Sequence, residues 1–188
     1  MLEKILSLDE KLFIYLNGLG SETYDGFWLI ITKQTSWIPL FLLLFYIIFK
    51  KLGTKQSLYL VLFVSILLLF TDQITNSFKN GFQRLRPCNN PAINTIIRVV
   101  QSRKSFSFFS GHASNTMAVA TFLYLIFKNN FKYFWLLFLW PLIFAYSRIY
   151  LGLHYPLDII FGYLCGAILG FLMFKVYQIA QEKYFPIQ

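Results

Sequence analysis

Three short segments hold the side chains of this sequence that are capable of chemistry. They read KNGFQRLRP from residue 79, SGH from residue 110 and SRIYLGLHYPLD from residue 147. The chain has 2 histidines, His112 and His154, and each lies in one of these segments. An isolated histidine at such a position usually has its polar tip in water and no further role. Two histidines accompanied by lysine, arginine and aspartate instead indicate a catalytic site.

The basic side chains of the segments predict a phosphate site. Lys79, Arg86 and Arg148 supply cationic donors, and an arginine can direct two N–H groups at phosphate oxygens. Ser110 and Gly111 stand at the predicted start of a helix, where free backbone amides and the positive end of the dipole favour an anion. Ser110 can also cap that helix, and the two roles are compatible.

The spacing of His154 and Asp158 predicts a nucleophile with an orienting partner. An aspartate that accepts a hydrogen bond from one imidazole nitrogen fixes the tautomer and leaves the other nitrogen free to attack. Asp158 can alternatively serve only as a helix N-cap. His112 is then the candidate general acid that protonates the leaving oxygen. With the cations, these groups predict phosphoryl transfer at a site without a metal.

A metal site is the main alternative for the same side chains. His112, His154, Asp158 and Asp72 are ligand types that zinc accepts. Three fixed cations nearby would repel a divalent metal and would suit a phosphate, so we expect no metal and no cofactor. Asp72 lies inside an apolar run, where an ionisable residue is a functional candidate by default. We expect it to pair with a cation or a polar group of the bundle.

Composition places the three segments in an integral membrane protein. The chain of 188 residues is 57% hydrophobic and 13% charged, whereas a soluble domain is about half apolar and a quarter charged. The net charge of +9 therefore favours anionic headgroups or phosphorylated substrates over nucleic acid. We expect a single all-α domain, a helical bundle with about five to six transmembrane helices. Five apolar runs predict transmembrane helices, near residues 27–49, 57–78, 112–127, 131–146 and 157–177.

The order of the spans places the charged loops together. With five spans, the loops at residues 79–110 and 147–157 fall on one side of the membrane, and the lysine-bearing turns fall on the other. The positive-inside rule, applied to those turns, makes them cytoplasmic. We therefore expect a multi-pass protein of the inner (plasma) membrane with its site facing the periplasm or exterior. The further basic residues of the long loop are expected to be solvated or to contact headgroups: Arg84, Arg98, Arg103 and Lys104.

Two further features concern packing. Residues 1–22 predict an amphipathic helix that lies in the membrane interface, and residues 57–177 are the expected catalytic core. Gly162, Gly166 and Gly170 follow one another at intervals of four in the last span, which predicts a ridge for close helix packing.

The three segments, in this order and spacing, resemble the tripartite signature of the type 2 phosphatidic acid phosphatase family. Phe109 departs from the pattern, because the second motif of the family usually begins with proline at that position. Many members have six spans, and here the amphipathic segment takes the place of one. The resemblance implies His154 as a nucleophile that forms a phosphohistidine, Asp158 as its orienter and His112 as general acid. It implies that the phosphate is held by Lys79, Arg86, Ser110, Gly111 and Arg148.

The expected partners are therefore a phosphorylated lipid substrate and membrane lipids, and no sequence feature indicates an oligomeric state. The resemblance implies a lipid phosphate phosphatase acting on undecaprenyl diphosphate, phosphatidylglycerophosphate, phosphatidic acid or the lipid A 1-phosphate. We expect undecaprenyl diphosphate, because small members of the family often act on it. Three alternatives remain: transfer of the phosphate to another lipid, vanadate-dependent oxidation, and non-enzymatic anion binding or transport. Transport would not require a His–Asp pair beside a second histidine.

Overall fold

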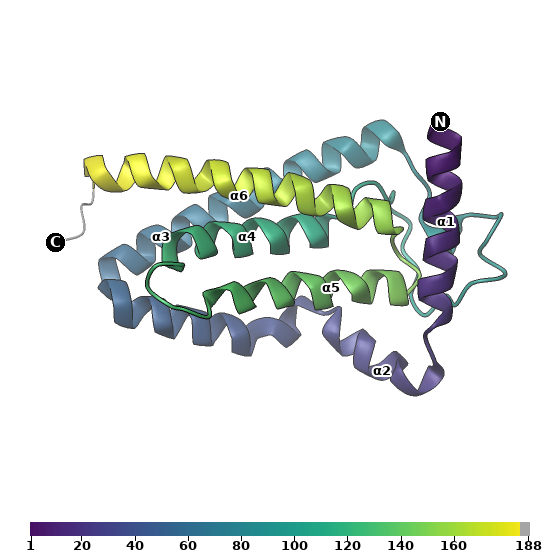
Figure 1. Cartoon of the computed structure of the whole chain (residues 1–188), viewed down its shortest axis with the longest axis horizontal. Helices are drawn as coiled ribbons and strands as arrows, with labels where there is room; N and C mark the ends of the chain where they lie inside the picture. Colours follow the sequence, from purple (N-terminus) through teal and green to yellow (C-terminus); the bar gives the residue numbers. More distant parts are fainter. Residues whose placement is uncertain (185–188) are drawn as a thin grey trace.

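The computed structural model describes residues 1–184, which form an all-helical bundle (Figure 1). Within these residues there is no strand, which confirms the predicted all-α fold. Short 3-10 turns lie at Gln34–Trp37, Pro87–Asn89 and Phe134–Phe138. The α-helices are α1 (Leu2–Gly18), α2 (Glu22–Ile31), α3 (Ile38–Phe82), α4 (Gly111–Phe127), α5 (Leu139–Tyr150) and α6 (Pro156–Tyr184).

Five helical segments run along the long axis of the bundle, because α3 contributes two of them (Figure 1). Gly53 bends α3 with a φ of 74°, in the left-handed region that glycine adopts without penalty. By length and hydropathy, Gln34–Asn89 and α6 are candidate membrane spans. The predicted first span is wrong at its start, because α2 ends at Ile31 before a polar stretch. The next helix begins only at Ile38, with Pro39 in its first turn.

Close packing of α6 on α4 holds the centre of the bundle. A Cβ atom at Gly162, Gly166 and Gly170 would lie 2.7, 2.3 and 2.5 Å from the carbonyl oxygens of three successive turns of α4. Side chains are therefore excluded there, and the predicted glycine ridge is confirmed. The contact brings the first turn of α6 against the first turn of α4, where the candidate site residues lie.

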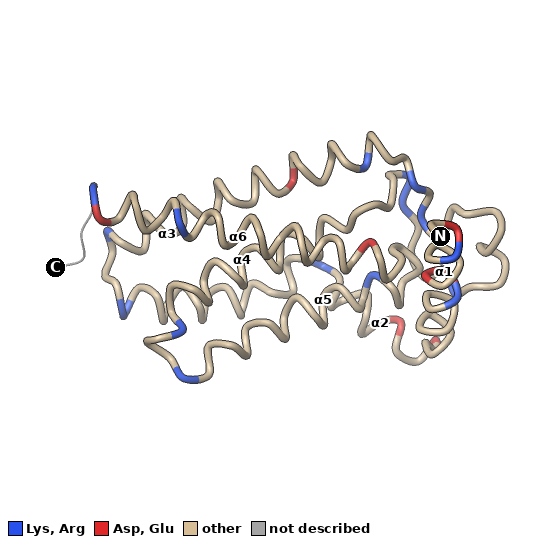
Figure 2. Tube along the Cα trace, turned by 45° about the horizontal axis from the view of Figure 1, so that its top comes forward, with Lys and Arg blue, Asp and Glu red and all other residues tan. Residues whose placement is uncertain are grey.

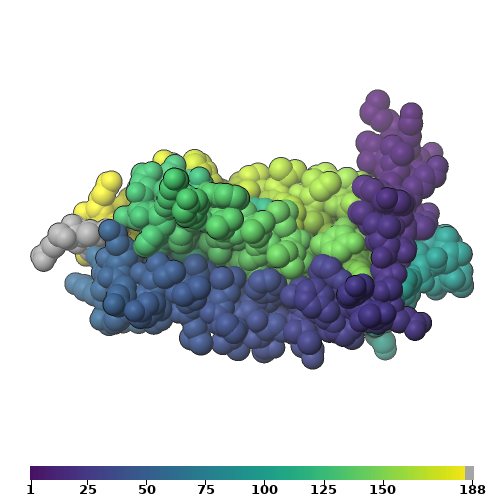
Figure 3. All heavy atoms as spheres, turned by 60° about the horizontal axis from the view of Figure 1, so that its bottom comes forward, coloured from purple at the N-terminus to yellow at the C-terminus, as the bar shows by residue number. Residues whose placement is uncertain are grey.

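Helix α1 lies across one end of the bundle, roughly at right angles to the long helices (Figures 1 and 3). Its outer face exposes apolar side chains such as Leu2, Leu8 and Leu12. Its inner face buries Asp9, Phe13 and Asn17 against the rest of the protein. This orientation is the one that a helix in the plane of the membrane interface would take.

Charged residues gather at the two ends of the bundle (Figure 2). The loop between α3 and α4 and the connection between α5 and α6 lie at the end that carries α1. The backbone amide of Cys88 joins them by donating to the carbonyl of Gly152 at 3.1 Å. The prediction that folding brings the two charged loops together is therefore confirmed.

Candidate active site

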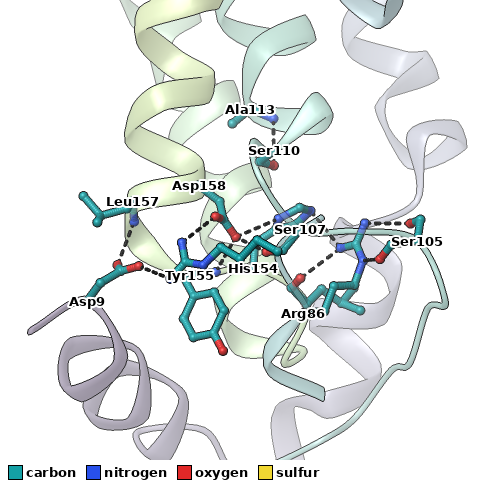
Figure 4. Close-up of polar contacts among 12 residues, drawn as sticks. Asp9, Arg86, Ser105, Ser107, Ser110, Ala113, His154, Tyr155, Leu157 and Asp158 are labelled. Carbon is teal, nitrogen blue, oxygen red and sulfur yellow. Dashed lines mark hydrogen bonds and ion pairs between the residues drawn. The ribbon is translucent and has the colours of Figure 1, made fainter. Parts of the chain in front are cut away.

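His154 lies in the connection between α5 and α6 and is 1% exposed. Its Nδ1 is 3.3 Å from Oδ2 of Asp158, and its Nε2 is 2.9 Å from Nη1 of Arg86 (Figure 4). Because an arginine can only donate, Nε2 carries the lone pair and Nδ1 carries the proton. Burial, with Arg86, Arg148 and Lys79 nearby, holds the pKa of His154 well below its usual value. The imidazole is therefore neutral, and the lone pair of Nε2 is directed at the guanidinium of Arg86.

Asp158 lies in the first turn of α6 and is completely buried. Its Oδ2 accepts hydrogen bonds from the backbone amide of Tyr155, at 3.0 Å, and from the hydroxyl of Ser107. Its Oδ1 accepts from Nη1 of Arg84 at 2.8 Å. The bond from Tyr155 satisfies an amide at the start of the helix. One carboxylate therefore caps the helix and contacts Nδ1 of His154 at the same time.

Arg86 is held rigidly by the loop that follows it (Figure 4). Its Nε and Nη2 donate to the carbonyl and hydroxyl oxygens of Ser105, at 2.7 and 3.0 Å, and Nη1 donates to the carbonyl of Leu153 at 2.9 Å. These bonds fix the guanidinium beside His154. Arg86 therefore connects the long loop to the connection that carries the histidine.

Arg148, near the end of α5, is 1% exposed and carries unsatisfied donors. Its Nη1 donates to the hydroxyl of Thr32, while Nε and Nη2 have no hydrogen-bond partner in the described chain. A buried guanidinium with unpaired donors is costly unless an anion supplies acceptors. Lys79 lies in the last turn of α3, with Nζ 3.9 Å from the position of a Cβ on Gly111. This arrangement fits a bound phosphate.

The first turn of α4 supplies backbone amides. Ser110 is the N-cap, and its hydroxyl accepts from the amide of Ala113 at 3.4 Å. The amide of Ser114 donates to the carbonyl of Ser110 at 3.0 Å, and that of Ser110 donates to the carbonyl of Asp158 at 2.9 Å. The amide of Ser110, which we expected to be free, is therefore occupied. The amides of Gly111 and His112 remain at the positive end of the helix.

His112 joins this anion site to a cavity of about 620 Å³ between α3, α4 and α5. Its ring lies 5.3 Å from the ring of Phe144. Aliphatic and aromatic side chains form most of the lining, among them Trp37, Phe41, Leu60, Val64, Leu68 and Trp140. A hydrocarbon chain can thus lie in the cavity with its polar end at His112.

Asp72 also lines this cavity, and its Oδ1 accepts from Nδ2 of Asn115 at 2.7 Å. The prediction that Asp72 pairs with a polar group is therefore confirmed. Across residues 1–184, no group of three or more His, Cys, Asp or Glu side chains is arranged to hold a metal ion.

Two arginines of the long loop differ from the expectation of a solvated or headgroup-binding loop. Arg84 forms ion pairs with Asp9 at 2.7 Å and with Asp158 at 2.8 Å. Arg98 pairs with Asp25 at 2.9 Å. Arg103 and Lys104 are exposed, as expected. The contacts of Arg84 were missed because Asp9 lies 75 residues away in the chain, so no local pattern indicates them.

Three hydroxyl residues at the site were also missed: Thr32, Ser105 and Ser107. Each touches a predicted site residue, respectively Arg148, Arg86 and Asp158. Serine and threonine are common in loops, and only their position in the fold distinguishes these three.

Comparisons with known proteins identify the family of the chain. The family model described as "PAP2 superfamily" matches residues 58–182. A lipid A 4'-phosphatase of Porphyromonas gingivalis is 34% identical over 186 residues, which are 97% of this chain and 78% of that protein. An undecaprenyl-diphosphatase of Sulfolobus acidocaldarius is 28% identical over 178 residues, which are 93% of this chain and 81% of that protein.

The fold is shared with a solved structure. The crystal structure of the first transmembrane PAP2 type phosphatidylglycerolphosphate phosphatase from Bacillus subtilis superposes with a TM-score of 0.69 at 19% identity. The match covers 96% of this chain and 89% of that one. The family match and the full-length relatives lead to one conclusion: the chain belongs to the PAP2 superfamily and is a membrane lipid phosphatase.

Proposed function

We propose that the protein hydrolyses a phosphate monoester of a lipid A-type saccharolipid through a phosphohistidine on His154, without a metal. The observation that carries the mechanism is the position of His154 between Asp158 and Arg86. Asp158 lies 3.3 Å from Nδ1, and Arg86 lies 2.9 Å from Nε2 on the other side. The nucleophilic lone pair thus points toward the group that would bind phosphate.

The reaction proceeds in two steps. In the first, Nε2 of His154 attacks phosphorus, a P–N bond forms and the bond from phosphorus to the lipid oxygen breaks. His112 gives its proton to that oxygen, and the negative charge of the bound phosphate favours the protonated form of His112 beforehand. In the second step, water attacks phosphorus while His112 takes a proton from it. The P–N bond breaks, and inorganic phosphate leaves.

The cations and amides stabilise the charge that develops on the phosphoryl oxygens. Arg148 offers its two unpaired donors, and Lys79 adds a point charge beside Gly111. The amides of Gly111 and His112 add the positive end of α4. Because the fold holds Arg148 and the amides of α4 in place before the substrate arrives, these groups need little reorganisation during the reaction.

The choice of substrate rests on the cavity and on the relatives. An apolar cavity that reaches His112 suits a lipid whose chains lie in the bilayer and whose phosphate lies at its surface. The lipid A 4'-phosphatase is more similar than the undecaprenyl-diphosphatase, at 34% against 28% identity. This favours lipid A over undecaprenyl diphosphate, which was our first expectation. Undecaprenyl diphosphate remains the second candidate, because the match to the undecaprenyl-diphosphatase also spans nearly the whole chain.

We also propose that the site faces the periplasm or exterior of the inner membrane. The bend of α3 and the connection between α4 and α5 lie at the opposite end of the bundle (Figure 1). These segments carry Lys50, Lys51, Lys128 and Lys132, and the positive-inside rule makes that end cytoplasmic. Thr95→Cys, in the exposed long loop, should react with a membrane-impermeant maleimide in cells with a permeabilised outer membrane. Asn129→Cys at the other end should not react, and the reverse pattern would overturn this orientation.

The function is tested with the purified protein in detergent and an excess of chelator. Bis-phosphorylated lipid A, undecaprenyl diphosphate, phosphatidylglycerophosphate and phosphatidic acid are each supplied, and released phosphate is measured. Mass spectrometry then identifies which phosphate lipid A has lost. The variants are His154→Ala and, as a matched control, Thr95→Ala on the exposed surface of the long loop.

We expect the highest kcat/KM on lipid A, loss of the 4'-phosphate, no turnover by His154→Ala and normal turnover by Thr95→Ala. A higher kcat/KM on undecaprenyl diphosphate would overturn the substrate assignment and leave the mechanism intact. An active His154→Ala protein would show that the nucleophile is another group. Activity lost only on chelation would overturn the metal-independent mechanism.

A further inference from the structure

Helix α1 reaches the interior of the candidate site through one carboxylate. Asp9 is 4% exposed, although it lies on a helix whose outer face is open. Its Oδ2 lies 2.7 Å from Nη2 of Arg84, and its Oδ1 accepts from the backbone amide of Leu157 at 2.8 Å (Figure 4). Leu157 lies in the first turn of α6, directly before Asp158. The N-terminal helix is thus fixed to the turn that carries the orienting carboxylate.

Arg84 lies between two carboxylates. Its Nη1 lies 2.8 Å from Oδ1 of Asp158, and its Nη2 lies 2.7 Å from Asp9. Its guanidinium also stacks on the ring of Tyr155, with 3.9 Å from Cζ to the ring centroid. Phe13 of α1 also packs against Tyr155, and the centroids of the two rings lie 5.3 Å apart. The planar fork of an arginine suits this double contact, and a lysine cannot reproduce it.

We propose that Asp9 and Arg84 are positioning residues for the His154–Asp158 pair. Arg84 holds Oδ1 of Asp158 so that Oδ2 faces Nδ1 of His154, and Asp9 holds Arg84 and offsets its charge. Neither residue needs to touch the substrate. The proposal makes α1 part of the catalytic structure, and it rests on the proposed roles of His154 and Asp158.

The charges around the pair set the direction of the expected effects. Asp158 faces Arg84, Ser107 and the amide of Tyr155, while His154 faces Arg86, Arg148, Lys79 and His112. Removing the positive charge of Arg84 leaves Asp158 a stronger partner for protonated His154. Removing the negative charge of Asp9 leaves Arg84 uncompensated and weakens that partner.

The test measures phosphate release as a function of pH with one lipid substrate, so that the ionisation of the substrate is common to all variants. Arg84→Gln should move the acid limb of the kcat/KM profile to higher pH, and Asp9→Asn should move it to lower pH, each by roughly one pH unit. The double variant should lie between them. KM should change less than kcat, because neither side chain contacts the lipid.

Asp25→Asn is the matched control. It breaks another ion pair between an N-terminal helix and the long loop, that of Asp25 with Arg98 at 2.9 Å, and should lower the melting temperature without moving the acid limb. Acid limbs that stay in place in both single variants, or that move together in proportion to lost stability, would overturn the proposal. His154→Ala in the same assay separates the two hypotheses. If this variant keeps its activity, the nucleophile is refuted and the positioning role falls with it. If it loses activity while both acid limbs stay in place, only the positioning role is refuted.

Discussion

Gly162→Ala gives a direct test of how precisely α6 must lie against α4. A Cβ at this position would lie 2.7 Å from the carbonyl oxygen of Ser110, whereas a relaxed carbon–oxygen contact is about 3.3 Å. The first turn of α4 must therefore retreat by about 0.6 Å. A misplacement of about 1 Å can cost 10²-fold in rate, so kcat should fall roughly ten-fold.

Gly170→Ala is the matched variant, two turns farther from the site on the same helix face. Its Cβ would lie 2.5 Å from the carbonyl oxygen of Ala118, which is a larger overlap. Overpacking of this kind costs about 1–3 kcal/mol of stability. The melting temperature should therefore fall at least as much as in Gly162→Ala, while kcat per folded molecule should stay closer to that of the parent.

The assay is phosphate release at saturating lipid, normalised to folded protein by size-exclusion chromatography, together with thermal unfolding of both variants. If Gly162→Ala keeps its full kcat, or if both variants lose activity only in proportion to stability, the geometric reasoning is refuted. The two overlaps then have only a packing consequence.

Three further predictions concern the site. Arg148→Lys should lower kcat by about 10²-fold or more, because an ammonium group cannot reproduce the rigid planar fork from which Nε and Nη2 of the guanidinium donate; initial rates check this. On acidification, the kcat/KM of the parent should persist below the pH at which an ordinary histidine protonates, because the pKa of His154 is lowered. An acid limb of the pH–rate profile that already lies near pH 6.5 or above would contradict this. Phe109→Pro should keep turnover per folded molecule but melt earlier, because it removes a ring that is 3% exposed and lies 5.1 Å from the Phe78 ring; thermal unfolding measures the loss.

The contacts of the site that could be predicted from the sequence are mostly between residues close together in the chain. His154 and Asp158 are four residues apart, one just before α6 and the other in its first turn, so their pairing is a local contact. The cap at Ser110 is likewise local, because its partner lies three residues further along. Partners from distant elements could not be predicted in this way, and Thr32 against Arg148 is an example.

The sequence by itself determined the membrane bundle and indicated the candidate residues for phosphoryl transfer, because hydrophobic run length and side-chain chemistry are local properties. Its glycine spacing also determined which face of α6 packs closely. Only the tertiary structure decided that Arg84 forms ion pairs with buried carboxylates, although we expected it in a solvated or headgroup-binding loop. Only the structure decided that Asp9 reaches the site from α1. Buried charges must find partners wherever the fold provides them. One of the two carboxylates that pair with Arg84 is Asp9 in α1, which lies 75 residues away in the chain.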